Sequence, residues 1–207
     1  MEIVSSFELC RHSMERVESL YSHDPTHYHT INHAKIVRLM LYNYWEDFKS
    51  QFEGFLDVES VQMKLETAII FHDCIYIPGS KFNEDDSADE ADAFMRDEGV
   101  DKKIRDEICD LIMSTKLDSK LDSQEKKLLH DLDWSGFATY EQLMEDEQKI
   151  LNEFRDAGYL LREVHRARFD FYKSLDKEQI FHSIFKKYEK IAHRNIEKRI
   201  IEFNRSL

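Results

Sequence analysis

A histidine and an aspartate stand side by side where an apolar segment gives way to a polar loop. They are His72 and Asp73, within the stretch FHDCIYIPGSKFNEDD, residues 71–86. Neutral imidazole and carboxylate groups are ligands that divalent cations bind in proteins. A cation held there could bind a water molecule, lower its pKa and polarise a phosphoryl oxygen. The pair therefore predicts a hydrolytic metal site, provided that further ligands come from elsewhere in the chain.

A second histidine, His33, shares the pattern that places His72 on the buried face of a helix. Steps of three or four residues connect each histidine with apolar side chains of its own helix, which puts both on a stripe facing the core. One histidine on such a face is most often a hydrogen-bonded core residue. Two of them, one followed directly by aspartate, favour metal binding. The apolar residues are Val37, Met40 and Tyr44 for His33, and Leu65 and Ala68 for His72.

A fourth ligand is expected from the segment LLHDLDWSGF, residues 128–137, which carries two aspartates. Successive residues of a helix turn by about 100°, so Asp131 and Asp133 point to nearly opposite sides. Only one of them can face a shared ion, and the spacing does not decide which. His130 in the same segment is either an additional ligand or a packed helix residue, and packing is the better interpretation.

The elements that must position these residues are helices. Only five Gly and two Pro occur in 207 residues, too few to form the many turns that a fold of short strands requires. Apolar residues recur at helical spacing along nearly the whole chain. We therefore expect an all-α fold, a single domain over 1–207, with a turn at Gly158. Helices are expected from Ile3 to Leu20, at about 30–52, from an Asp57 cap through Ile69, in a short segment capped by Ser87, from Ile104 to near Thr115, from a Ser123 cap through Leu132, and at about 139–156, 160–174 and 178–205.

Composition limits the classes of partner. A formal net charge of -13 repels nucleic acid, so none is expected as a partner. A small phosphorylated substrate is compatible with this charge, because a bound cation inverts the local field. No apolar run of about 18 residues occurs and the N-terminus lacks a signal-peptide pattern, so no membrane partner is expected. Three widely spaced cysteines suit the reducing cytoplasm, and the oligomeric state is left open, a homodimer included.

Five segments of the chain, taken together, are more specific than the His-Asp pair. They are YHTINH at 28–33, FHDCIY at 71–76, NEDDSA at 83–88, DLDW at 131–134 and AHRNIEKRI at 192–200. In this order, and in register from about 20 to 200, the chain resembles the HD-domain superfamily of metal-dependent phosphohydrolases. The similarity is to the subgroup usually described as predicted phosphohydrolases of that superfamily. The resemblance implies a single helical bundle of the HD type with a metal site in its centre, and it names a reaction class without a substrate.

The resemblance also assigns metal ligands. The four implied ligands are His33, His72, Asp73 and Asp133. They would hold one divalent ion, for which Mn, Co, Mg, Ni, Zn and Fe are all candidates. Asp133 fits the last position better than Asp131, the reserve choice, because LDW matches the helix of the family. The chain departs from the family in STKLD, residues 114–118, where Asp118 stands in place of a frequent histidine.

Other residues are expected around the ion. Asp73 has a catalytic role as a ligand, and Glu84 is expected to orient or deprotonate the attacking water, a role that a general base performs. The alternative for Glu84 is a charge at the start of a helix. Substrate contacts are expected from His29, Asn83, Arg168 and Arg194, the arginines because their forked donors suit phosphate. A surface histidine, a helix cap and ion pairs between helices are the plainer interpretations of these four.

The leading functional hypothesis is a metal-dependent phosphohydrolase that acts on a small phosphoester, a nucleotide included. A non-catalytic nucleotide- or metal-binding module is one alternative. A diiron oxygenase of the same fold is another, and it needs extra histidines between the His-Asp pair and the final aspartate. Only His130 lies between His72 and Asp133, which counts against the oxygenase.

Overall fold

The computed structural model describes residues 5–22, 26–50, 52 and 57–206. Within these ranges the chain forms nine α-helices and three short 3-10 helices and has no strand, so the all-α prediction is confirmed. Ile3 and Val4, which open the first expected helix, lie outside the described residues. The elements are α1 (Ser6–Glu18), η1 (Leu20–Ser22), α2 (Ile31–Lys49), α3 (Val58–Phe71), α4 (Asn83–Asp97), α5 (Lys102–Met113), α6 (Gln124–Asp133), η2 (Trp134–Ala138), α7 (Tyr140–Asp156), α8 (Leu161–Leu175), η3 (Ile184–Tyr188) and α9 (Glu189–Ser206).

Side-chain caps fix where several helices begin. Asp57 accepts hydrogen bonds from the backbone N–H groups of Glu59 and Ser60 and starts α3. Ser123 accepts one from the N–H of Lys126 and starts α6. Both caps agree with the sequence prediction. Each satisfies a donor that a helix start leaves unpaired, which stabilises the helix by about 1 kcal/mol.

The fourth helix begins earlier than predicted. Ser87 is not its cap, because α4 starts at Asn83 and Ser87 lies buried inside it. The Ser87 hydroxyl instead accepts the N–H of Ile75 at 3.1 Å and donates to the Ile75 carbonyl at 3.3 Å. Carboxylates at 84–86 fill the first turn, where the positive end of the helix dipole favours them. Ser87 therefore ties the loop after α3 to α4.

The last helix begins later than predicted, at Glu189 rather than near 178. Side chains hold the backbone before it in a different conformation. The Glu189 carboxylate accepts the N–H groups of Ile180 and Phe181 at 2.9 and 2.8 Å, and Asp131 accepts those of the next two residues. Ile180 and Phe181 are also fully buried. A regular helix over this segment would lose both sets of contacts.

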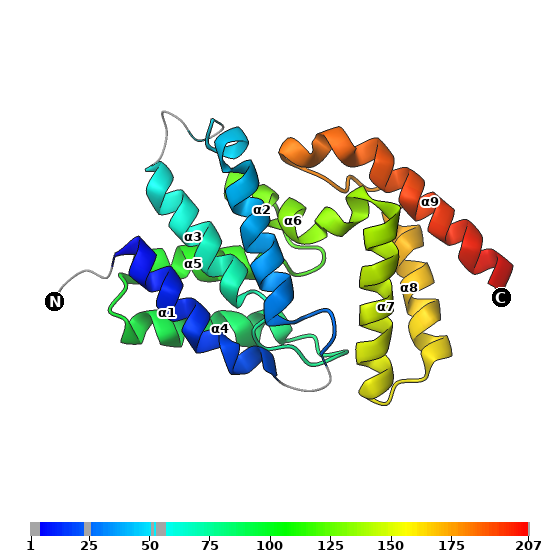
Figure 1. Ribbon diagram of the computed structural model, residues 1–207, viewed down its shortest axis with the longest axis horizontal. Helices are drawn as coiled ribbons and strands as arrows, with labels where there is room; N and C mark the ends of the chain where they lie inside the picture. The colour runs from blue at the N-terminus through cyan, green and yellow to red at the C-terminus, as the bar shows by residue number, and fades with distance from the viewer. Residues whose placement is uncertain (1–4, 23–25, 51, 53–56, 207) are drawn as a thin grey trace.

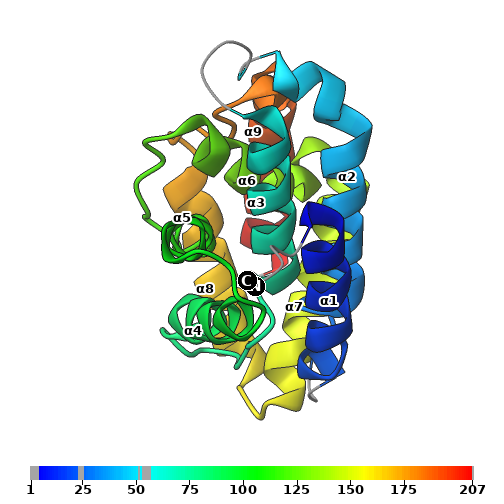
Figure 2. The same cartoon turned by 90° about the vertical axis from the view of Figure 1, so that its left-hand side faces the viewer.

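Helix α3 is the centre of the first group of helices. It packs against α1, α2 and α5, and α4 packs against α5 (Figures 1 and 2). Residues 65–71, the last two turns of α3, are all buried, as in a helix that runs through a core. Because α3 ends inside the molecule, His72 and Asp73 emerge there and not at the surface.

Helices α7, α8 and α9 form a second group beside the first (Figure 1). α7 and α8 are an antiparallel pair joined at Gly158, whose φ of 88° favours glycine, at the predicted turn. Glu147 of α7 is buried and ties the three helices together. It accepts hydrogen bonds from Tyr172 of α8 and from Arg199 of α9.

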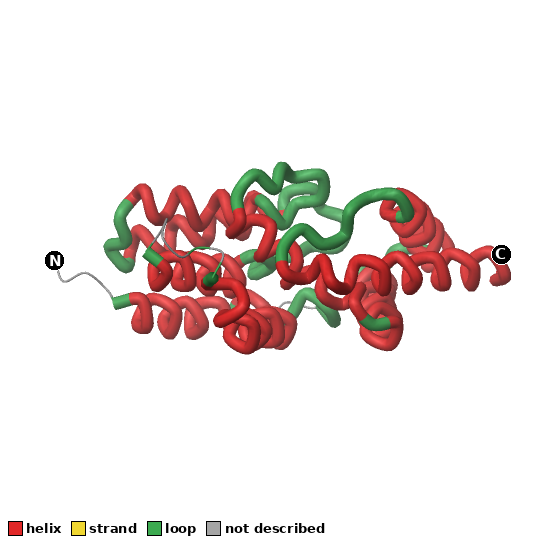
Figure 3. Tube along the Cα trace, turned by 90° about the horizontal axis from the view of Figure 1, so that it is seen from above, coloured by secondary structure: helices red, strands yellow, loops and turns green. Residues whose placement is uncertain are grey.

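The longer loop segments lie in the middle of the molecule, between the two groups of helices (Figure 3). Figure 1 shows the segment that follows α3 and the residues just before α2 in this middle region. None of the described helices is both long enough and apolar enough to cross a membrane.

Candidate metal centre

His33 reaches the centre from the first turn of α2. Thr30 caps this helix, and its hydroxyl accepts the His33 N–H at 3.4 Å. Nε2 of His33 lies 2.9 Å from Oδ1 of Asp133. The ring of Tyr28 covers the imidazole, with ring centroids 4.6 Å apart. The cap and the aromatic neighbour together fix the direction of the imidazole.

His72 enters from the other side as the C-cap of α3. Its Nδ1 lies 2.8 Å from the carbonyl oxygen of Ile69, which can only accept, so Nδ1 carries the proton. Its buried Nε2 lies 2.9 Å from Oδ2 of Asp73 and 3.5 Å from Oδ1 of Asp133, without hydrogen-bond geometry toward either. A carbonyl partner on one ring nitrogen and a free, inward-facing second nitrogen are typical of a metal-binding histidine.

The structure brings together four side chains that the sequence proposes as ligands. One potential ligand atom of each lies within 4.8 Å of those of the other three. Two ligands on opposite sides of an ion, each about 2.4 Å from it, are separated by about 4.8 Å. The four therefore fit a single divalent ion. They are His33, His72, Asp73 and Asp133.

The charges of this cluster are strongly coupled. Burial alone would raise the pKa of Asp133, but the hydrogen bond with His33 and the nearby His72 imidazole outweigh it and hold the pKa far below its usual value. Burial would likewise raise the pKa of Asp73, and the neighbouring His72 lowers it. Burial would lower the pKa of His72, whereas the two carboxylates raise it well above its ordinary value. Both aspartates are thus anionic at neutral pH, which is the state that binds a cation.

Asp131, the reserve ligand, points away from the cluster. Its carboxylate is fully buried and accepts the N–H of His182 and both the N–H and the hydroxyl of Ser183. Asp131 therefore anchors the segment before η3. His130 also lies apart, because its ring stacks on Trp134 with centroids 4.5 Å apart. The packed-residue interpretation of His130 agrees with this position.

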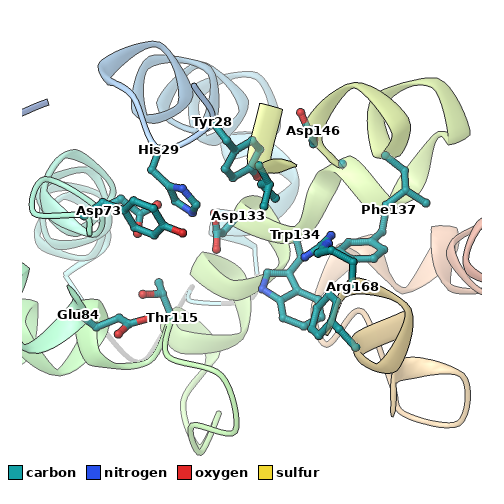
Figure 4. A pocket seen from close by; sticks show the side chains of 15 residues that line it. Tyr28, His29, Asp73, Glu84, Thr115, Asp133, Trp134, Phe137, Asp146 and Arg168 are labelled. Carbon is teal, nitrogen blue, oxygen red and sulfur yellow. The ribbon is translucent and has the colours of Figure 1, made fainter. Parts of the chain in front are cut away.

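A cavity of about 180 Å³ opens beside Asp73 and Asp133. Glu84, on the first turn of α4, and Arg168 of α8 are among its walls. Figure 4 shows Asp73 and Glu84 on one side, Arg168 on the other and Asp133 between them. Two of the predicted ligands, the predicted base and one predicted phosphate contact therefore face one space.

Arg168 has no carboxylate partner among the described residues. One terminal nitrogen donates to the hydroxyl of Tyr172 at 2.9 Å, and the guanidinium carbon lies 4.9 Å from the ring centroids of Phe171 and Tyr172. Its Nε is buried without a hydrogen-bond partner in the described structure. In a chain of net charge -13, an unpaired and partly buried arginine is an exception that an anionic ligand would satisfy.

His29 borders the same cavity and is held by Glu153. Oε2 of Glu153 lies 2.8 Å from Nδ1 of His29, and Oε1 accepts the N–H groups of residues 27–29. The imidazole also stacks on Tyr76, with centroids 3.4 Å apart. Glu153 of α7 thereby fixes both the backbone before α2 and the orientation of the His29 ring.

Three residues singled out in the sequence lie outside the walls of this cavity. The buried amide of Asn83 accepts the N–H of Ile77 and donates to its carbonyl, so it closes the loop before α4. Arg194 is exposed on α9. Asp118 is exposed after α5 with a φ of 68°. Neither Asn83 nor Arg194 therefore lines the cavity, where the predicted substrate contacts would lie.

Sequence reasoning missed other residues at the site. Tyr28, Tyr76 and Asp146 line the cavity, and Glu153 supports it. Burial raises the pKa of Asp146, to which Gln142 donates a hydrogen bond at 2.7 Å. Asp146 and Glu153 belong to a helix rich in acids, a pattern that usually marks a solvated face, so the sequence carried no signal for them. The tyrosines stood inside the quoted segments and could have been singled out there.

No protein-family model, curated protein or solved structure matches this chain.

Proposed function

We propose that this chain is a metal-dependent phosphohydrolase acting on a small phosphoester. The observation that carries the proposal is the convergence of His33, His72, Asp73 and Asp133 from three helices. The orphaned Nε2 of His72 favours an ion over a purely structural cluster, because a buried nitrogen without a partner costs free energy. We also propose that the helices form a bundle of the HD type, the fold that the sequence resemblance implies.

The ion that these four residues would hold supplies an activated water and a Lewis acid for the phosphoryl oxygen. The protein contributes the placement of the other groups. Asp73 and Asp133 provide two negative charges that balance a divalent cation. The ester is cleaved when a water oxygen bonds to phosphorus and the bond from phosphorus to the ester oxygen breaks. The water gives up one proton to a base, and the leaving ester oxygen takes up one proton, so the products are an alcohol and phosphate.

Glu84 is the group that we assign to accept that proton. It stands on the first turn of α4 and faces the same cavity as Asp73. It is not one of the four clustered residues, so it stays available as a base. On the opposite wall, the guanidinium of Arg168 is placed to hold a phosphoryl oxygen and to balance the charge that develops on it.

The proposal is tested by stripping the protein of metal with a chelator and restoring one ion at a time. Mn, Co, Mg, Ni, Zn and Fe are each assayed for phosphate release from a panel of nucleotides and sugar phosphates. At least one ion is expected to restore turnover. Asp73→Ala should hold less metal and release no phosphate, because it loses a ligand and a balancing charge. An equally active, metal-free Asp73→Ala protein would refute the mechanism.

The same experiment separates the other candidate functions. Binding of a nucleotide without turnover under any ion would assign the chain to the class of binding modules. Turnover that requires iron and oxygen and releases no phosphate would assign it to the oxygenases. Arg168 lines the same cavity as Asp73 and Asp133 and suits a ligand that carries a phosphoryl group, which favours the hydrolase and the nucleotide-binding module over the oxygenase.

A further inference from the structure

A wide groove continues outward from the cavity at the candidate metal centre. The groove has a volume of about 590 Å³ and shares Glu84, Trp134 and Arg168 with the smaller cavity. A phosphoester whose phosphoryl group lies at the cluster would therefore extend its organic part into this groove. We call it the aromatic groove. Its walls include Tyr76, Trp134, Phe154, Tyr159, Ala167 and Phe171.

The walls of the aromatic groove are held in place before any ligand binds. The hydroxyl of Tyr159, in the turn between α7 and α8, donates to the carbonyl of Pro78 at 3.0 Å. Gly79 makes this contact feasible, because a Cβ at that position would lie 2.3 Å from the Tyr159 hydroxyl oxygen. Gly79 also has a φ of 81°, which other residues rarely adopt. Little conformational entropy is thus lost at this wall on binding.

The chemistry of the groove selects the organic part of the ligand. Its aromatic side chains offer flat surfaces on which a ring system can stack. The hydroxyls of a bare sugar phosphate would instead lose hydrogen bonds to water against the apolar wall, which costs free energy. Shape and polarity therefore favour a flat ring of the size of a nucleobase or an aryl group over a sugar alone.

The charges along the same walls select the number of phosphoryl groups. Among the described residues, Arg168 is the one lysine or arginine that lines the cavity and the groove. It can balance a single phosphoryl group beside the metal. Second and third phosphoryl groups would lie against carboxylates without a cation. The carboxylates outside the proposed ligand set are Glu84, Asp146 and Glu163.

We infer that the substrate is a monophosphate ester whose organic part is a flat, uncharged ring system, and that this part lies in the aromatic groove between α7, α8 and the loop after α3. The inference rests on the proposed phosphohydrolase function for its reacting end. Nucleoside monophosphates and simple aryl-carrying monophosphates share this chemistry, and the assay distinguishes them.

A second cavity, of about 410 Å³, also borders the cluster, through His33 and Asp133, and provides the internal comparison. His33, Ile36 and Lys149 are among its walls. Its lysine already pairs with Glu145 at 2.8 Å, whereas Arg168 has no such partner in the described structure. The free cation and the aromatic walls therefore both assign the substrate to the aromatic groove.

The first test compares substrates with matched leaving groups. Adenosine 5′-monophosphate, benzyl phosphate and glucose 6-phosphate are all esters of primary alcohols, and adenosine triphosphate adds two phosphoryl groups. The metal-loaded protein is expected to show kcat/KM at least tenfold higher for one or both ring-carrying monophosphates than for glucose 6-phosphate or for the triphosphate. Equal or better hydrolysis of the sugar phosphate or the triphosphate would overturn the inference and leave the hydrolase proposal standing.

The second test places the same indole in each of the two spaces. Ala167→Trp fills the aromatic groove from α8, and Ile36→Trp occupies the second cavity from α2; both positions are exposed. Ala167→Trp should raise KM for the preferred ring-carrying substrate at least tenfold, and Ile36→Trp should leave it within twofold. The reverse pattern, or no effect of Ala167→Trp, would overturn the assignment to this groove.

A third measurement does not require turnover. The chain has two tryptophans, and Trp45→Phe leaves Trp134, in the wall of the groove, as the one reporter. Adenosine or benzyl alcohol, which carry the ring without phosphate, should quench the fluorescence of Trp134. The substitution Ala167→Trp should weaken the binding of both compounds, as measured by calorimetry. Quenching by a ring compound, together with no hydrolysis of any phosphoester in the first test, would support the groove and refute the hydrolase proposal. Absence of binding by both ring compounds would overturn the groove.

Discussion

Nε2 of His33 lies 2.9 Å from Oδ1 of Asp133, although one hundred residues of chain separate them. The two residues meet because α2 packs against α6 and both helices pack against α3. An ion at this point would therefore join three helices that only the folded chain brings together. Metal binding and folding should be linked, since the unfolded chain has no such site.

We expect the ion that restores activity to raise the free energy of unfolding. A ligand at one hundred times its Kd stabilises the folded state by about 2.7 kcal/mol when the unfolded chain does not bind it. Urea unfolding with a chelator and with each candidate ion measures this change. Asp133→Asn serves as the control and should show a much smaller rise. An equal rise in wild type and in this variant would place the ion elsewhere.

Asp131 and Asp133 are a matched pair of variants, because Asp131 anchors the segment before η3 and Asp133 is the proposed metal ligand. Asp131→Asn keeps the metal cluster but replaces a carboxylate that accepts three donors, so we expect it to lower the free energy of unfolding by about 2–3 kcal/mol. Asp133→Asn should instead lose metal. Metal content by elemental analysis, beside urea unfolding, distinguishes the two. Loss of metal from Asp131→Asn in a folded protein would contradict the assignment.

The helical fold could be predicted because it depends on local patterns, whereas the full set of four ligands was predicted from the resemblance to the HD-domain superfamily. His33 and His72 lie on apolar stripes, and Asp57 and Ser123 are recognisable caps. Local patterns did not decide between Asp131 and Asp133, because the contact of Asp131 with the segment at 182–183 is long-range, and Asp133 was preferred on the match of LDW to the family.

The errors have the same physical origin. Ser87 has the residue type of a cap, but Ile75 uses its hydroxyl. The segment near 178 has helical periodicity, but the carboxylate of Glu189 holds it in another conformation. Glu153 was missed because a buried acid on a helix rich in acids resembles its exposed neighbours. Side chains that satisfy distant backbone groups decide these cases, and local patterns do not reveal them.

Glu84→Gln tests the proposed base. The variant should keep the metal, because Glu84 is not part of the four-residue cluster, and should lose about 10²–10⁴-fold in kcat, the usual contribution of a general base. Asp86→Asn removes the same charge from the same turn at an exposed position and is the matched control. Wild-type turnover by a metal-loaded Glu84→Gln protein would show that Glu84 is not the base and only contributes a charge at the start of α4.

Glu153→Gln tests the support of His29 through its dependence on pH. Burial alone would raise the pKa of Glu153, but the hydrogen bond with His29 and the backbone N–H groups hold it below 4.5, its ordinary value. A carboxyl group whose pKa is lowered by folding stabilises the protein above its unfolded pKa, and this contribution is lost as the pH falls through the folded pKa. At pH 7 the variant should therefore unfold more easily by about 1–3 kcal/mol, because charge-assisted hydrogen bonds become neutral ones. Urea unfolding of both proteins between pH 7 and pH 3 should show a constant difference down to about pH 4.5 and a shrinking one below it.

Glu145→Gln, which removes an exposed partner of Lys149 from the same helix, should change stability by less than about 0.5 kcal/mol throughout. A difference between wild type and Glu153→Gln that stays the same at pH 3 would mean that the charge of Glu153 does not hold the backbone before α2.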